Sequence, residues 1–180
     1  MRIPKRRRTE GKTDYLKRMK LLKGETPRLI FRKTNRYIIA QYVISREAKD
    51  EIKIGITSKK LLDYGWPEEF SGSLKSIPAS YLTGLIMGKE IIKNKMKIPI
   101  VDLGMIRAIS KNKTFAFIKG LTDAGIKIKC SEENFPENER IEGKNLKKDF
   151  SKIFKEIKLK IESGKQEVSH SNRKSIQKEK

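Results

Sequence analysis

The sequence is poor in the side chains on which many metal sites and acyl-transfer sites depend. Its 180 residues include one cysteine, Cys130, and one histidine, His170. A single cysteine excludes an internal disulfide framework and any zinc site built from several cysteines. One histidine, placed in a polar C-terminal segment, leaves no basis for zinc catalysis or for a Ser-His-Asp triad. We therefore expect a chain that holds no metal and no cofactor.

Long hydrophobic runs are missing as well. The longest uncharged apolar stretches, such as residues 98–101, fall far short of the roughly 20 residues that span a bilayer. Residues 2–8 are mostly basic and no apolar segment follows them, which argues against a secretory signal. With 36% hydrophobic residues, the chain can bury one core, and a large two-domain enzyme is not expected.

Acidic residues are outnumbered almost two to one. The chain has 43 lysines and arginines against 22 aspartates and glutamates, a formal net charge of +21. Residues 1–23 carry a net +8 and residues 144–180 a net +7, so the two ends hold most of the excess. Like charges at this density oppose compaction unless a polyanion neutralises them. We expect that polyanion to be nucleic acid, with an anionic membrane surface or a merely solvated basic end as alternatives.

The pattern between residues 27 and 57 is that of a β-meander. Two β-branched and aromatic runs, 28–32 and 37–44, flank the polar segment 33–36, which predicts a hairpin. Residues 51–57 alternate strictly and indicate a third, half-exposed strand. Because these strands follow one another so closely, we expect them to pair in antiparallel fashion.

The second half of the chain alternates between helical and strand patterns. Residues 78–96 and 110–124 have helical spacing, the apolar run 98–103 indicates a strand covered on both faces, and 126–130 indicate a short last strand. We therefore predict an α/β fold. Its mixed sheet would combine an antiparallel three-strand meander with a following βαβα unit, and the helices would pack on that sheet.

The charged ends lie outside this core. Residues 1–26 combine a basic arm, aperiodic over 1–13, with a short helix; residues 27–143 form the α/β core domain, and residues 164–180 form a basic tail that we expect to be disordered. Residues 144–163 form an amphipathic helix with lysines on one side. Its apolar stripe, which we expect to dock on the domain or on a partner, consists of residues 146, 150, 153, 154, 157 and 161.

Six sequence blocks stand in a fixed order and cover most of residues 5–143. One of them is Pro78-Ala-Ser-Tyr-Leu-Thr-Gly84, and the six occupy residues 6–15, 27–41, 78–84, 101–104, 115–125 and 138–143. In order and spacing they resemble the large-subunit ribosomal protein family numbered eighteen, the 5S rRNA binder, in its archaeal and eukaryotic form. Each block is a weak signal alone, but six in register are hard to obtain by chance.

This resemblance implies a protein without catalytic activity and with a ribonuclease-H-like mixed sheet, as in other domains of the translation machinery. It implies a place in the central protuberance of the large subunit of the cytoplasmic ribosome. There the protein would bridge 5S rRNA to the large rRNA. The expected partners are therefore 5S rRNA, large-subunit rRNA and neighbouring ribosomal proteins, with no membrane.

Two other function classes stay open at this point. An RNA-processing enzyme could use Asp102 and Asp123 with Mg²⁺, although such chemistry needs several acids around two metal ions and the first strand, 28–33, has none. We favour a structural role for Asp102, as a hydrogen-bond acceptor at a strand end or helix start. A sequence-tolerant nucleic-acid binder is the second alternative.

The side chains expected to contact RNA are mostly arginines, because a guanidinium binds phosphate in bidentate fashion and can stack on an unpaired base. Tyr15 is a candidate for base stacking, with a small core contact as the alternative. The hairpin tip Lys33–Arg36 projects donors beyond the sheet, unless it is an ordinary solvated turn. The full set is Arg6, Arg7, Arg8, Lys12, Tyr15, Arg18, Arg28, Arg32, Lys33, Asn35, Arg36, Lys148, Lys152 and Lys155.

Overall fold

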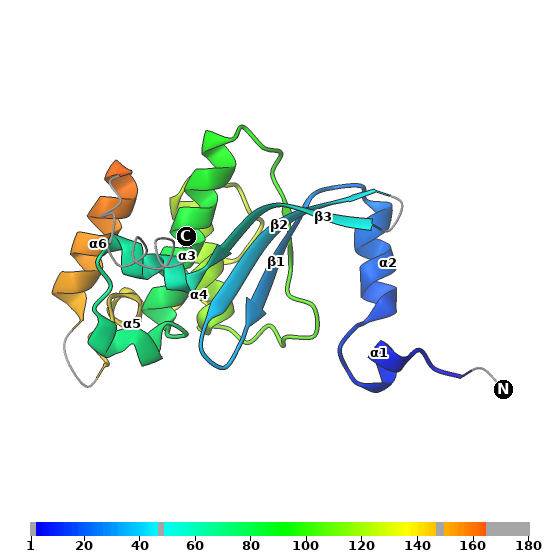
Figure 1. Cartoon of the computed structure of the whole chain (residues 1–180), viewed down its shortest axis with the longest axis horizontal. Helices are drawn as coiled ribbons and strands as arrows, with labels where there is room; N and C mark the ends of the chain where they lie inside the picture. The colour runs from blue at the N-terminus through cyan, green and yellow to red at the C-terminus, as the bar shows by residue number, and fades with distance from the viewer. Residues whose placement is uncertain (1–2, 47–48, 147–149, 165–180) are drawn as a thin grey trace, which may run out of the picture.

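The sheet has four strands: β1 (Arg28–Lys33), β2 (Ile38–Arg46), β3 (Lys49–Thr57) and β4 (Ile100–Asp102). In the computed structural model, which describes residues 3–46, 49–146 and 150–164, the strand order is β3-β2-β1-β4. β2 is antiparallel to both β1 and β3, whereas β4 runs parallel to β1. The predicted meander and the predicted α/β class with a mixed sheet are confirmed (Figure 1).

The hairpin between β1 and β2 forms where its turn chemistry predicts. Lys33 pairs with Ile38, and the turn between them closes when the Thr34 amide donates to the Tyr37 carbonyl over 2.9 Å. The Thr34 hydroxyl also accepts from the Tyr37 amide at 2.9 Å. Side chain and backbone thus fix the same tight turn, and residues 33–36 are all exposed at its tip.

Two helices, α3 (Ile77–Lys93) and α4 (Lys113–Asp123), pack side by side. Glycines permit their close approach: a Cβ atom on Gly84 would lie 2.2 Å from the carbonyl oxygen of Phe117. Gly120 on α4 makes an equally close approach to the backbone of α3. No side chain fits between the two helices at these points, so the glycines set the distance between them.

The core lies between this helix pair and the sheet. The ring centroids of Phe31 on β1 and Phe117 on α4 are 4.9 Å apart. Leu29, Ile38 and Leu82 have no exposed surface. Aromatic contacts and the burial of apolar side chains are the main favourable contributions to the folding free energy of a chain with this much repulsive charge.

Helix α6 (Ser151–Ser163) begins later than the predicted helix 144–163, and residues 144–146 are not helical. The predicted apolar stripe nevertheless packs, with its first two positions, 146 and 150, lying before the helix. The ring of Phe150, directly before it, lies 4.5 Å from that of Trp66 between centroids, and Phe154 lies 5.6 Å from Tyr81. The stripe therefore docks on the chain's own domain. The connecting segments hold α5 (Asn138–Glu142) and the 3₁₀ helices η1 (Ser58–Tyr64), η2 (Glu68–Ser73) and η3 (Glu132–Asn134).

Two strand predictions differ from the structure. The run 98–103 forms only the three-residue β4, and Ile98 and Ile100 are 57% and 42% exposed, so it is not covered on both faces. Residues 126–130 are not a strand, so within the described residues no strand follows α4, although β3, α3, β4 and α4 follow one another in the predicted βαβα order. The physical reason is the same in both cases: β4 is an edge strand, and an apolar pattern cannot say whether a neighbour is present.

The helix boundaries also shift. α3 ends at Lys93 rather than at 96, and α4 begins after Asn112 rather than after Ser110. The Asn112 side chain accepts a hydrogen bond from the Lys113 amide at 2.6 Å, which makes it the cap of α4. None of the helices within the described residues is long and apolar enough to cross a membrane.

Candidate nucleic-acid interface

Two short basic helices precede the sheet: α1 (Arg6–Thr9) and α2 (Tyr15–Lys23). The Asp14 carboxylate caps α2 by accepting from the amides of Leu16 and Lys17 at 3.0 and 3.1 Å. Neither helix buries any residue. One turn of helix thus forms within residues 1–13, which we expected to be an arm without secondary structure because their sequence is aperiodic. Arginine has a high helix propensity, and this favours a helical turn even where no apolar face exists.

The side chains of α1 and the following loop make only local, exposed contacts. Arg7 Nε donates to the Thr13 hydroxyl at 3.0 Å, and Lys12 Nζ lies 2.6 Å from a Glu10 carboxylate oxygen. Exposed pairs of this kind contribute less than about 1 kcal/mol each. Arg6, Arg7, Arg8 and Lys12 are therefore available to exchange these partners for phosphate.

Tyr15, the candidate for base stacking, is half-buried at the start of α2. The Lys5 ammonium lies over its ring, 4.7 Å from the centroid. One ring face therefore has a cation–π contact, and the ring is not part of the buried core.

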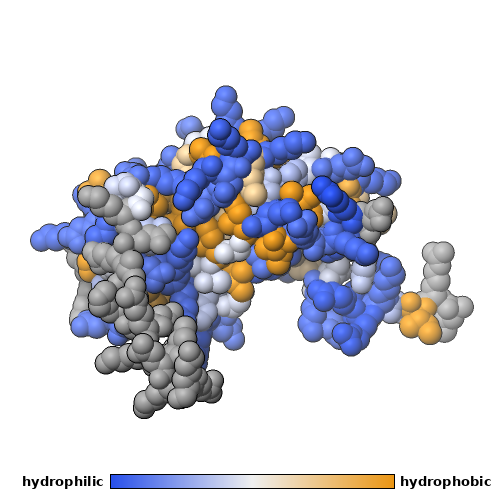
Figure 2. All heavy atoms as spheres, turned by 45° about the horizontal axis from the view of Figure 1, so that its top comes forward, coloured by the Kyte–Doolittle hydropathy of each residue, from blue (hydrophilic) through white to orange (hydrophobic). Residues whose placement is uncertain are grey.

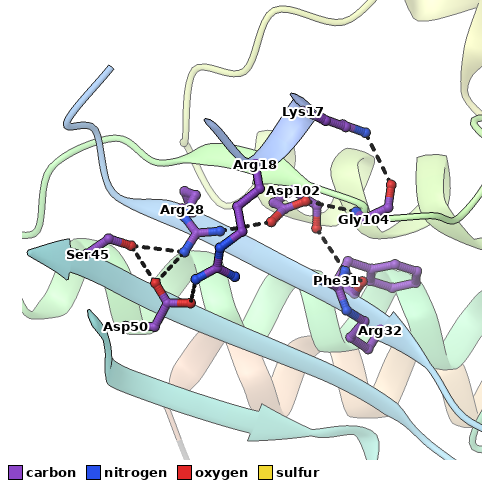
Figure 3. Close-up of polar contacts among 9 residues, drawn as sticks. All are labelled: Lys17, Arg18, Arg28, Phe31, Arg32, Ser45, Asp50, Asp102 and Gly104. Carbon is purple, nitrogen blue, oxygen red and sulfur yellow. Dashed lines mark hydrogen bonds and ion pairs between the residues drawn. The ribbon is translucent and has the colours of Figure 1, made fainter. Parts of the chain in front are cut away.

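α2 is held to the body of the molecule by polar contacts, which Figure 3 shows. Arg18 Nη2 donates to Asp50 Oδ2 at 3.0 Å, and Lys17 Nζ donates to the Gly104 carbonyl at 3.3 Å. Arg18 is thus partly committed to a protein carboxylate. Lys17 was not among the predicted contacts, although its place beside Arg18 on the same helix was a usable signal.

Arg28 does not lie on the surface. Its side chain is 2% exposed and donates to Asp50 at 2.6 Å, to Asp102 at 3.2 Å and to the Ser45 hydroxyl at 2.9 Å (Figure 3). Its expected role as a phosphate ligand is therefore corrected: the guanidinium joins β1 to β3 and β4 from within. Asp50 is the missed residue of this site.

The electrostatics around Asp50 follow from these contacts. Partial burial by itself raises the pKa of Asp50, but hydrogen bonds from Ser45 and Arg28 and the charges of Arg28 and Arg18 outweigh it. The pKa of Asp50 therefore lies below its ordinary value of 3.8, and the carboxylate stays ionised at neutral pH. Arg18, the cation nearest the surface, is fixed in place by that charge.

A small polar cavity of about 120 Å³ lies between α2 and the ends of β1 and β4. Arg32 lines it, and its Nη1 donates to the Phe31 carbonyl at 2.9 Å, while its guanidinium lies against Gly104. Gly104 has a φ of +59°, so both conformation and space favour glycine at this position. Cations of the N-terminal segment and of β1 meet at this cavity: Arg7, Lys12, Lys17, Arg18, Arg28 and Arg32.

The hairpin tip forms a second basic region. Lys33, Asn35 and Arg36 are exposed there. Burial, followed by the charges of Lys33 and Lys75, lowers the pKa of Lys113 at the start of α4. Lys75 and Lys113 were not predicted, and no local sequence pattern signals them, because tertiary packing brings them near Lys33.

The third basic region is the outer side of α6, where Lys152 and Lys155 are exposed. Lys148 lies outside the described residues. Figure 1 places α6 at one end of the long axis and α1 with α2 at the other, so the predicted cations do not form one patch. The end formed by α1 and α2 is almost wholly hydrophilic on the face shown in Figure 2.

The carboxylates of the enzyme alternative have structural partners. Asp102 Oδ1 accepts from the Gly104 amide at 2.8 Å, which confirms its predicted role as an acceptor at a strand end. Asp123 Oδ2 accepts from the Tyr81 hydroxyl at 2.6 Å, and burial together with Asp123 raises the pKa of that hydroxyl far above its ordinary value. Within the described residues, no group of three or more His, Cys, Asp or Glu could hold a metal ion.

Comparison with known proteins gives a consistent result. A family described as "Ribosomal large subunit proteins 60S L5, and 50S L18" matches residues 1–99. The large ribosomal subunit protein uL18 of Korarchaeum cryptofilum is 40% identical over 154 residues, which cover 86% of this chain and 77% of that protein. The protein of the same name from Methanoculleus marisnigri is 40% identical over 144 residues, covering 80% of each.

The matched region includes α1, α2, the whole meander and α3, so it spans two of the three basic regions. The two relatives extend the similarity over most of the chain. The chain therefore belongs to the family of ribosomal large subunit proteins 60S L5 and 50S L18: it is an rRNA-binding structural constituent of the large subunit of the cytoplasmic ribosome, and not an enzyme.

Proposed function

We propose that this protein binds 5S rRNA and helps to attach it to the large rRNA in the central protuberance. The observation that carries the proposal is the separation of the exposed cations. α1 and α2 lie at one end of the molecule and the lysines of α6 at the other (Figure 1). Two separate basic ends suit contact with two RNA segments better than one continuous patch does.

The three regions differ in the chemistry that they offer to RNA. Arg6, Arg7 and Arg8 can bind phosphates in bidentate fashion and stack on unpaired bases, which suits irregular RNA. Lys152 and Lys155 present point charges from a rigid helix, which suits a regular phosphate backbone. We infer that α1 and α2 contact 5S rRNA, and that α6 contacts the large rRNA.

We infer further that the sheet belongs to the ribonuclease-H-like group found in the translation machinery. The support is its strand order, an antiparallel meander extended by a strand parallel to β1. We also propose residues 27–143 as the core domain, which the basic segments 1–26 and 144–163 flank.

The first experiment compares affinities at about 0.15 M salt, where non-specific binding is screened. Purified protein is titrated with 5S rRNA from the same organism and with a transfer RNA, which is also folded and single-chained. We expect much tighter binding to 5S rRNA. Equal affinity for both RNAs would support the sequence-tolerant binder instead.

The second experiment tests the two-sided arrangement. A Lys152→Ala/Lys155→Ala variant should keep its affinity for 5S rRNA and lose affinity for a complex of 5S rRNA with the adjoining large-rRNA domain. An Arg6→Ala/Arg7→Ala/Arg8→Ala variant should lose affinity for 5S rRNA itself. If both variants lose affinity for 5S rRNA equally, the division of labour between the two ends is wrong.

A further inference from the structure

An apolar groove runs along the free edge of β4. Its volume is about 500 Å³, and its walls are residues 98–101 and 103, on and around β4, and the segment 127–130. Phe115 and Ile118 of α4 complete the lining. We refer to this feature as the β4 groove. It lies outside the basic regions described above.

Both walls of the β4 groove have backbone groups without a strand partner. The sheet ends at β4, and among the described residues no backbone hydrogen bond joins the segment 127–130 to it. Residues 126–130 nevertheless alternate in burial, with Ile126 buried, Ile128 and Cys130 half-buried and the lysines between them exposed. The segment thus has the pattern of a strand and lacks a neighbour to pair with.

Exposed isoleucines lie at the first residue of β4 and two residues before it. Ile98 and Ile100 are 57% and 42% exposed. Natural proteins commonly protect edge strands with charges, bulges or covering segments, because an exposed apolar edge invites pairing with another chain. In a protein with 36% charged residues, two exposed isoleucines at this edge indicate a surface that is covered in the assembled state.

The charges around the β4 groove are all of one sign. Lys127 and Lys129 are exposed at its wall, and none of the described residues that line it carries a carboxylate. A negatively charged occupant is therefore favoured. Both an acidic peptide and RNA meet this condition, and an apolar floor of the groove favours the peptide. Phe115, Ile118 and Val101 supply that apolar floor, and the groove has no arginine to bind a phosphate.

We propose that the β4 groove binds an extended segment of a neighbouring large-subunit protein, with alternating apolar and acidic residues. The segment pairs with β4 as an added strand, directs its apolar side chains towards Ile100 and Phe115, and places its carboxylates beside Lys127 and Lys129. This inference does not depend on which rRNA the protein binds. It requires only that the chain is part of the large subunit.

Cys130 is a direct probe of whether the β4 groove is covered, because it is the only cysteine of the chain and lines the groove. Its reaction with a maleimide is timed in the free protein and in isolated large subunits, at one pH, because burial raises the pKa of this thiol. An occupied groove should slow the reaction by about tenfold or more, since the reagent loses access. An equal rate in both states would overturn the proposal.

A matched pair of variants tests where the protection arises. Ile100→Lys places a charge in the groove at an exposed position, so it should restore the fast reaction of Cys130 in the subunit without preventing incorporation. Leu159→Lys is the control: Leu159 is 64% exposed on α6, away from the groove lining. Protection that persists in Ile100→Lys subunits would show that something other than a strand on β4 covers the thiol.

The nature of the occupant is tested by cross-linking with a water-soluble carbodiimide, which joins amines to carboxylates in contact. In isolated subunits we expect Lys127 or Lys129 to be joined to an aspartate or glutamate of a neighbouring protein. A link to a second copy of this chain, an ultraviolet cross-link from 127–130 to rRNA, or no carbodiimide link from either lysine would each overturn the proposal.

Discussion

At the residue scale, the guanidinium of Arg28 binds side chains from all three other strands: Ser45 of β2, Asp50 of β3 and Asp102 of β4. It lies on β1 and holds carboxylates from residues 50 and 102, which are 22 and 74 positions away in sequence. Asp102 in turn accepts from the Gly104 amide, and Asp50 holds Arg18 of α2. The buried arginine thus connects the free edge of the sheet to the basic helices that face solvent.

Replacing Arg28 should therefore damage stability rather than RNA contact. Arg28→Ala leaves Asp102 buried without its cation, which typically costs about 3–5 kcal/mol of unfolding free energy. We expect the lower end, about 3 kcal/mol, since Asp50 is partly exposed and water can reach it. Urea denaturation of the free protein measures the change.

The control for this prediction is Arg36→Ala at the exposed hairpin tip. It removes the same charge and should change stability by less than about 0.5 kcal/mol. If the two variants unfold alike, the buried network does not stabilise the fold.

Asp50 predicts a specific pH dependence. Because its pKa is lower in the folded protein than its ordinary value of 3.8, it stabilises the folded state above about pH 4. That contribution is lost as the pH falls through the lowered folded-state pKa. Asp50→Asn should therefore flatten the dependence of stability on pH below pH 4, measured by urea denaturation at a series of pH values.

A substitution of an exposed carboxylate elsewhere separates this effect from the general loss of negative charge. Glu132→Gln in η3 is suitable, since Glu132 is exposed. Its curve should keep the acid slope of the original protein. A slope unchanged by Asp50→Asn would contradict the linkage.

At the element scale, α6 is held by its apolar stripe. Phe154 is 4% exposed, and its ring contacts Tyr81 on α3. Phe154→Ala should lower the unfolding free energy by about 3 kcal/mol, the lower part of the range for a buried phenylalanine, because the lost ring leaves a void. Thermal and urea unfolding of the free protein measure this loss. Lys155→Ala, the exposed neighbour, should unfold like the original protein; equal behaviour of both variants would mean that α6 is not docked.

The contact between α3 and α4 depends on glycine. A Cβ atom at Gly84 would lie 2.2 Å from a backbone oxygen of α4, so Gly84→Ala must push the helices apart. We expect a loss of about 1–3 kcal/mol or more, in spite of the better helix propensity of alanine. Gly72→Ala is the control, as nothing lies within 4 Å of its added Cβ. Urea unfolding compares the two, and equal stability would contradict the close contact.

The elements that the sequence predicts correctly are those with local causes. The hairpin depends on the polar turn 33–36, and the α6 stripe depends on periodicity, so both are visible in a single segment. Residues 126–130 have the pattern of a strand but do not pair with the sheet, which ends at β4. Whether a segment finds a pairing partner is decided by tertiary structure and not by its own sequence. The burial of Arg28 depends on carboxylates far away in sequence, which no local pattern shows.

At the scale of the whole molecule, charge and burial are divided between different parts. The core between the sheet and α3 with α4 is apolar, while α1 and α2 bury no residue and are held by polar contacts to β3 and Gly104. The repulsion within a net charge of +21 therefore lowers the stability of the core only little. Most of the excess positive charge lies at the ends of the chain, where rRNA can neutralise it. Both charged ends should then contribute separately to RNA affinity.

The salt dependence of RNA binding tests that separation. Each phosphate contact contributes about 0.7–0.9 to the slope of log affinity against log salt. Arg6→Ala/Arg7→Ala/Arg8→Ala should reduce the slope by about 2–3, and Lys152→Ala/Lys155→Ala by about 1–2, on the complex of 5S rRNA with large rRNA. Lys127→Ala/Lys129→Ala is the matched control, because it removes two charges at the β4 groove, where we place no phosphate. If this control reduces the slope as much as the α6 variant does, net charge rather than its position governs binding.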